Sequence, residues 1–114
     1  MAELTFSIAD EICTDEVKNF IIETHRCVDL YAKKNHDYGN SFDKGMSTIG
    51  MAYGIGRLYD KMNRLITLSN PNQKQQVNDE SIDDTLMDLA CYSIMMLAYR
   101  KKEIENKQKQ INFE

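Results

Sequence analysis

The chain has 114 residues, of which 42% are hydrophobic and 28% are charged, and its net charge is −4. These values predict one soluble globular domain over residues 1–114, with residues 1–13 and 107–114 peripheral or partly disordered. The negative charge argues against broad nucleic-acid binding, which usually requires a basic face. With one proline and five glycines in the chain, long helices are expected.

The sequence also predicts a cytoplasmic protein. The N-terminus has no basic start followed by an apolar core, so no signal peptide is expected. The most apolar stretch, 89–99, is far shorter than the ~20 residues that cross a bilayer, so no membrane partner is expected. The cysteines, Cys13, Cys27 and Cys91, form no C-x-x-C pair. Reduced thiols in the cytoplasm are therefore expected.

The first predicted helix covers residues 14–34, after a mixed segment with little regular structure. Thr14 is a suitable N-cap, and acidic residues follow it where the helix dipole is positive. Its apolar residues recur at intervals of three and four. Residues 35–43 are rich in Asn, Asp, Gly and Ser, which predicts a loop.

Two further long helices are predicted, at 46–69 and 80–106, separated by a polar loop at 70–79. The apolar stripe of the first consists of Met51, Ile55, Leu58, Met62, Leu65 and Ile66. In the second, Ser81 and Asp84 resemble a capping box. That helix is apolar on two sides, which a three-helix monomer does not fully cover. The fold is therefore predicted to be all-α, a small bundle of three long helices plus short extras, assembled as a homo-oligomer.

Charged residues form two stripes on these helices. Arg57, Asp60, Lys61 and Arg64 fall within about 100° of arc, roughly opposite the apolar stripe. On that helix alone, a solvated face is the simplest interpretation. On the next helix Asp84 and Asp88 are four residues apart, on a face that continues with apolar residues. Both carboxylates are expected to be covered and so to need a partner.

Two interpretations of the stripes stay open at this point. In the structural one, Asp84 and Asp88 form salt bridges with the basic stripe, within a subunit or across a dimer. In the functional one, the two aspartates, with Asp60 as a further candidate, bind Mg²⁺, and the basic residues bind phosphate oxygens. Arg57, Lys61 and Arg64 would then hold the phosphates, since arginine suits bidentate contacts.

The loop at 35–43 supplies a third group of candidates, His36, Asp37, Tyr38 and Asn40, whose polar atoms and aromatic ring suit a base or a sugar. The alternative is that the polar side chains of the loop satisfy their own backbone. No catalytic residue is identified, because the sequence contains neither a G-x-S-x-G motif nor a P-loop.

Three ordered segments resemble a known family. NHDYGNSF at 35–42, RLYDKMNRL at 57–65 and ESIDDTLMDLACY at 80–92 are similar to the phage and bacterial domain called nucleotide modification associated domain 1, over residues 34 to about 99. This resemblance implies a connection with nucleotide or DNA-base metabolism. A weaker resemblance is to the MazG-like all-α nucleoside triphosphate pyrophosphatases, which bind Mg²⁺ through acidic residues and are often oligomeric. The chain lacks their E-E-x-x-E cluster.

The leading functional hypothesis is a phage-type protein that acts on or sequesters a nucleotide or nucleotide-derived metabolite. Metal-assisted hydrolysis of a phosphate is one form of it, so whether the chain is an enzyme stays open. A second hypothesis is a non-catalytic sponge for a nucleotide signal of host antiphage defence. A third is a structural interaction protein whose charge stripes are interhelical salt bridges.

Overall fold

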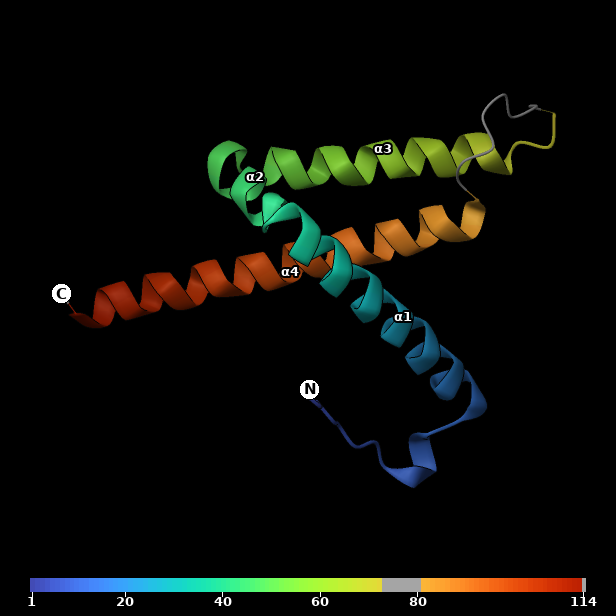
Figure 1. Ribbon diagram of the computed structural model, residues 1–114, viewed down its shortest axis with the longest axis horizontal. Helices are drawn as coiled ribbons and strands as arrows, with labels where there is room; N and C mark the ends of the chain where they lie inside the picture. Colours follow the sequence, from blue (N-terminus) through green and yellow to red (C-terminus); the bar gives the residue numbers. More distant parts are fainter. Residues whose placement is uncertain (73–80, 114) are drawn as a thin grey trace.

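The computed structural model describes residues 1–72 and 81–113, and every element of regular secondary structure in these residues is a helix. After a short 3₁₀ turn at Asp10–Ile12 come four helices: α1 (Asp15–Tyr38), α2 (Ser41–Ile49), α3 (Met51–Ser69) and α4 (Ile82–Phe113). In Figure 1, α3 and α4 lie side by side and run in opposite directions, and α1 crosses α4. The all-α prediction is confirmed.

Helix α1 begins where the sequence predicts but ends four residues later. The hydroxyl of Thr14 accepts a hydrogen bond from the Val17 amide, which confirms the N-cap. The helix continues to Tyr38, so the prediction of a loop over 35–43 is wrong for most of that segment. It ends at Gly39, and both Gly39 and Asn40 have left-handed backbone angles that stop the helix. Helix α2 starts at the next residue.

The predicted helix at 46–69 is in fact two helices that meet at Gly50. This residue has φ of +92°, which side chains other than glycine rarely tolerate, so the chain turns there. Helix α2 therefore folds back against α3, and its Phe42 and Met46 are buried with Met96 of α4. These three residues form the centre of a small core, to which Tyr53 and Tyr92 add partly buried rings.

Helices α3 and α4 approach closely at Gly54. A Cβ atom at this position would lie 2.8 Å from the Sδ and Cε atoms of Met96 and 3.0 Å from Sδ of Met46. The absence of a side chain is therefore what allows the two helices to pack here.

Helix α4 is longer than predicted. The expected capping box is present, since the Ser81 amide donates to the Asp84 carboxylate and the Asp84 amide donates to the Ser81 hydroxyl. The helix continues past residue 106 to Phe113, because residues 101–113 are rich in Lys, Glu and Gln, which are good helix formers, and contain neither Gly nor Pro. The predicted loop at 70–79 begins with Asn70, and its residues from 73 onward lie outside the described part of the chain.

The largest departure from expectation is the orientation of α3. Four residues of its predicted apolar stripe, Met51, Ile55, Met62 and Ile66, are exposed, whereas the charged Lys61 and Arg64 are half-buried. The helix is rotated in this way because its basic side turns toward an acidic residue of α4. The interpretation of the basic stripe as a solvated face is therefore wrong for Lys61 and Arg64.

Candidate functional site

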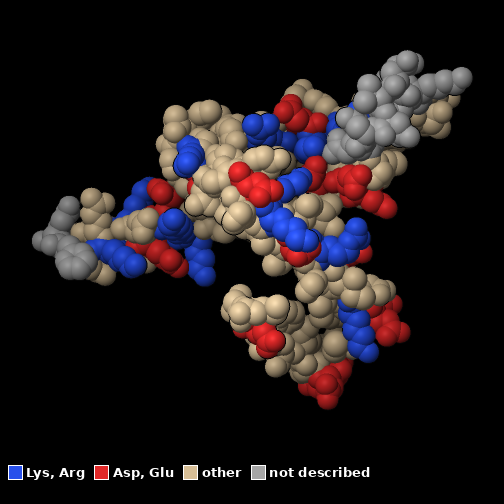
Figure 2. Space-filling model, viewed as in Figure 1, with Lys and Arg blue, Asp and Glu red and all other residues tan. Residues whose placement is uncertain are grey.

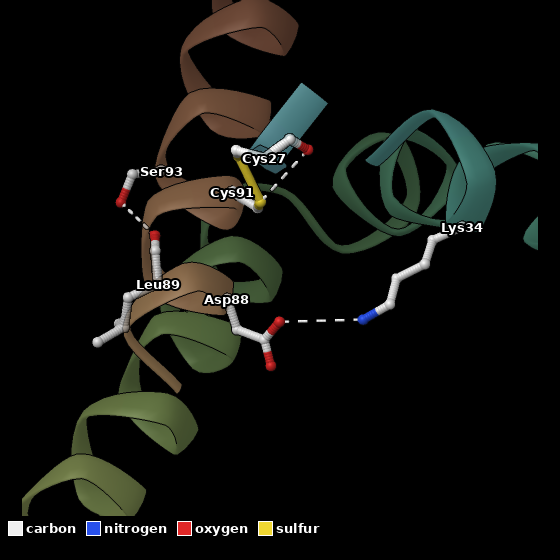
Figure 3. Close-up of a disulfide and its surroundings, with 6 residues drawn as sticks. All are labelled: Cys27, Lys34, Asp88, Leu89, Cys91 and Ser93. Carbon is white, nitrogen blue, oxygen red and sulfur yellow. Dashed lines mark hydrogen bonds and ion pairs between the residues drawn. A yellow bond between two sulfur atoms is a disulfide. The ribbon is translucent and has the colours of Figure 1, made fainter. Parts of the chain in front are cut away.

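The two charge stripes meet at Asp88. Its carboxylate lies 2.9 Å from the Lys61 ammonium of α3 and 3.9 Å from the Lys34 ammonium of α1. The side chains of Lys61 and Asp88 are 25% and 19% exposed, whereas that of Lys34 is 54% exposed. Figure 3 shows Lys34 reaching toward Asp88 from the neighbouring helix. One aspartate thus links three helices, with a tight partner and a looser one.

Asp84 differs from Asp88, although the two residues lie on the same side of α4. It is exposed, which makes the expectation that both aspartates are covered wrong for Asp84. Its hydrogen bonds with the backbone and the side chain of Ser81 lower the pKa of the Asp84 carboxyl. Arg26 and Lys34 act in the same direction by their charge. Asp84 is therefore engaged as the cap of α4.

These surroundings do not suit a resident metal ion. Within residues 1–72 and 81–113, no three Asp, Glu, His or Cys side chains gather closely enough to bind one. Asp88 contacts ammonium groups and Asp84 contacts Ser81. Asp60 is exposed on α3. A carboxylate that already neutralises a lysine is less available as a ligand for Mg²⁺.

A pocket of about 270 Å³ opens next to Asp88, where α1, α2, α3 and α4 meet. Its wall combines aromatic rings with basic side chains, contributed by Tyr31, Lys34, Tyr38, Tyr53, Arg57 and Tyr92. Small-molecule sites usually measure about 300–1,000 Å³, so this pocket falls just below that range. On the face shown in Figure 2, Lys and Arg are mixed with Asp and Glu, and the described residues of this face form no broad patch of one sign.

Arg57 is held in this pocket by the aromatic residues behind it. Its guanidinium lies 5.1 Å from the centroid of the Tyr53 ring. A hydrogen bond to Tyr53 raises the pKa of Arg57, so the residue stays charged. The rings of Tyr53 and Tyr92 in turn lie 5.7 and 5.8 Å from that of buried Phe42. The α2 segment thereby anchors the wall that carries Arg57.

The structure divides the residues predicted for base or sugar binding. Tyr38 lines the pocket. The side chains of His36 and Asp37 are 89% and 71% exposed and contact each other at 3.3 Å, outside the lining. Asn40 accepts a hydrogen bond from Asn35 and so stabilises the turn between α1 and α2. This agrees with the alternative interpretation, in which the polar side chains of the segment have a structural role. Of the predicted phosphate-binding residues, Arg57 lines the pocket, and Lys61 and Arg64 lie farther along α3.

Sequence reasoning missed Lys34, Tyr31, Tyr53 and Tyr92 as pocket residues. Lys34 was predicted only as the last residue of the first helix. A signal was available, because Tyr31, Lys34, Asn35 and Tyr38 follow the three- and four-residue spacing of one helix face. That signal was hidden by the expectation that the helix ends at residue 34.

Cys27 and Cys91 are also brought together beside the site. Their Cα atoms lie 6.1 Å apart, and the structure joins their sulfur atoms in a disulfide between α1 and α4 (Figure 3). This separation is within the range that a disulfide spans. The expectation of reduced thiols is therefore wrong for this pair, while Cys13 is a free thiol. Together with Lys34, the pair attaches α1 to α4.

The comparison with known families bears on this geometry. Residues 34–99 match the family described as nucleotide modification associated domain 1, which is more than half of the chain. The chain belongs to this family. The matched segment includes Lys34, Tyr38, Arg57, Lys61 and Asp88. No curated protein and no solved structure matches the chain. Among the helices of the described residues, none is both long and apolar enough to span a membrane.

Proposed function

We propose that this chain binds a nucleotide, or a metabolite derived from one, in the pocket next to Asp88. The observation that carries the proposal is the combination of Arg57 and Lys34 with the rings of Tyr31 and Tyr38 in one cavity. Basic side chains recognise phosphate groups, and aromatic rings stack on bases. The name of the family, which links it with nucleotide modification, supports the same class of ligand.

Arg57 and Lys34 are the best candidates for contacting the phosphate. Arg57 is exposed, stays charged, and is steadied by Tyr53. Lys34 is more than half exposed and lies 3.9 Å from Asp88, so moving it toward a ligand breaks only a loose ion pair. Lys61 is held at 2.9 Å and is largely covered, which makes it a poorer candidate. The proposal thus shifts the phosphate contacts from Lys61 and Arg64 to Lys34.

Tyr38 and Tyr31 are the best candidates for contacting the base. Tyr38 is 66% exposed and Tyr31 is 38% exposed, so both rings keep surface available for stacking. Stacking of a base on an aromatic side chain contributes about 1–3 kcal/mol. Tyr53 and Tyr92 are instead packed against Phe42 and form the rear wall. The small volume of the pocket favours a mononucleotide over a larger ligand.

We further propose that the ligand is captured rather than hydrolysed. Among the described residues that line the pocket, Asp88 alone carries a carboxylate, and it is paired with lysines. A general base or a metal ligand would have to be released from such a pair before it could act. Binding without chemistry is the behaviour expected of a nucleotide sponge.

The test is a binding panel read by calorimetry, with nucleoside mono- and triphosphates and cyclic and ADP-ribose-type nucleotides, each with and without Mg²⁺. One member should bind and be recovered intact after the protein is denatured. Arg57→Gln should weaken its binding at least about tenfold, the usual effect of losing a charge-assisted contact of about 1.4 kcal/mol. Arg100→Gln, which changes an exposed arginine of α4 outside the pocket, is the matched control.

The panel also has clear negative results. Failure of every compound to bind, or equal weakening by both arginine substitutions, would contradict the proposed site. Metal-dependent turnover that Asp88→Asn abolishes would replace capture by hydrolysis and restore a catalytic role for that residue.

A further inference from the structure

The antiparallel pair of α3 and α4, here called the hairpin, has two sides with opposite character. One side, which includes Tyr53, Arg57, Asp88 and Cys91, faces α1 and α2. By the 100° spacing of helical residues, a set of exposed apolar side chains lies about 160° further round α3 and about 135° further round α4. This apolar face consists of Met51, Ile55, Tyr59, Met62 and Ile66 on α3, and Leu86, Ala90, Ile94 and Leu97 on α4.

The chain exposes far more surface than a folded monomer of its size. Its accessible surface is 9642 Å². A compact monomer of 13.2 kDa exposes about 6,400 Å² by the usual scaling of surface with mass. The excess, about 3,200 Å², is spread over the whole chain and is large enough to include the roughly 1,000–2,500 Å² that one subunit of an obligate dimer buries. A second copy packed on the apolar face would bury part of this excess.

The two halves of the apolar face are centred at the same level of the hairpin. Gly54 contacts Met96, and Lys61 pairs with Asp88. Counting along the antiparallel helices from these contacts places Leu58 level with Tyr92. Residues 58–59 are the midpoint of the α3 stripe, and residues 91–92 are the midpoint of the α4 stripe. A two-fold axis that crosses both helices of the hairpin at this level would pack the α3 stripe against the α3 stripe of the second copy. It would likewise pack the α4 stripe against the α4 stripe of that copy.

The charges along α4 fit the same axis. Asp83 and Lys101 are exposed and lie five helical turns apart at one edge of the apolar face. Their midpoint is Tyr92, the residue at the level of the axis. In an antiparallel pair of α4 helices centred there, Asp83 of each copy would lie opposite Lys101 of the other. Such self-complementarity is what a two-fold interface requires.

We propose that two copies of this chain pack through the apolar face, as a four-helix bundle in which each α4 lies antiparallel to the α4 of its partner near Tyr92. The pocket that contains Arg57 and Tyr38 opens on the side of α3 away from this face, whereas Leu86, Ala90 and Ile94 of the face also border a groove between α1 and α4. The proposal does not depend on ligand binding in the pocket. It specifies the surface and the symmetry of the oligomer.

Size-exclusion chromatography with light scattering tests the proposal at protein concentrations of about 1–100 μM. The wild type should be a dimer, and Leu97→Glu should raise the dissociation constant at least about a hundredfold, because it buries a charge in an apolar interface. Ala98→Glu makes the same kind of change at the next residue, which is exposed but outside the apolar face. It should stay dimeric, and circular dichroism should find both variants helical.

A charge exchange tests the register without burying any charge. Asp83→Lys should weaken the dimer about three- to tenfold by placing two lysines opposite each other, and adding Lys101→Asp should restore it. A monomeric wild type, an unaffected Leu97→Glu dimer, or an equal effect of Ala98→Glu would overturn the interface. Failure of the second exchange to rescue the first would overturn the antiparallel register at Tyr92.

Discussion

The two sides of the α3–α4 hairpin reverse the usual arrangement of a small protein. The side that faces α1 and α2 contains the Lys61–Asp88 pair, at 2.9 Å and largely covered, next to the pocket. The outer side presents Ile55, Met62 and Leu97, with 55%, 48% and 66% of their surface exposed. Charge is inside and apolar surface is outside.

This reversal is costly for a monomer but reasonable for a subunit. A covered ion pair contributes little net stability, yet losing one partner is expensive because a charge is left buried. An exposed apolar face, in turn, favours folding only when something covers it. The inner side is therefore suited to fix geometry around the pocket, and the outer side to bury area in an assembly. Unfolding measurements test the inner side and the seam between the two helices, whereas the oligomeric state tests the outer side.

The largest effect on unfolding is expected at the inner side, from Lys61→Ala. This substitution leaves Asp88 about four-fifths covered and, of its two ion pairs among the described residues, keeps the looser one with Lys34. The free energy of unfolding should fall by about 2–3 kcal/mol, less than the 3–5 kcal/mol of fully buried pairs because some solvent reaches this one. Urea denaturation at one fixed protein concentration measures it, since dimerisation makes stability depend on concentration.

Lys33→Ala is the control for this measurement. Lys33 pairs with Asp29 at 3.0 Å on the exposed surface of α1, and such pairs contribute about 0–1 kcal/mol. Equal losses in the two variants would show that the covered position of Lys61 is unimportant. A double substitution, Lys61→Met with Asp88→Leu, should recover most of the stability, because neither charge is then left buried.

A smaller effect is expected at the seam between α3 and α4, from a pair of glycine substitutions with opposite signs. Gly54→Val places methyl groups against Met96 and Met46, and should lower the free energy of unfolding by about 1–2 kcal/mol. Gly56→Ala meets nothing within 4 Å and should raise it by about 0.5–1 kcal/mol through helix propensity. Thermal unfolding of both variants at one concentration is the measurement, and loss of stability in both would contradict the assigned packing.

Local signals in the sequence predicted much of the fold. Thr14 and the Ser81–Asp84 box identify helix starts correctly, because capping depends on atoms only a few residues apart. The break at Gly50 was missed, since a helical glycine and a glycine at positive φ look alike in a sequence. The prediction of a loop over 35–43 failed for a similar reason, because the polar residues before Gly39 are also compatible with a last helical turn.

The rotation of α3 could not be predicted from its own periodicity. Its apolar stripe predicts which side is buried only if a single chain makes the whole core, and the described chain buries few apolar side chains. The pairing of Lys61 with Asp88 was one of two open interpretations, and the contacts of Lys34 depend on how α1 crosses α4. Tyr38 and Arg57 were predicted as ligand contacts from residue type alone, whereas His36 and Asp37 have the same chemistry but face solvent.

The smallest expected effect concerns the cap at the start of α4, and it depends on pH. The folded pKa of Asp84 is lowered by its hydrogen bonds with Ser81, so the ionised cap stabilises the protein above the unfolded pKa of about 4. This contribution is lost as the pH falls through the lower, folded pKa. Asp84→Asn should therefore be less stable than the wild type at pH 7, and the difference should shrink in acid. Asp83→Asn removes the same charge one residue earlier and should show a smaller difference. A difference for Asp84→Asn that stays constant from pH 7 to pH 2 would mean that the carboxylate charge is irrelevant to the cap.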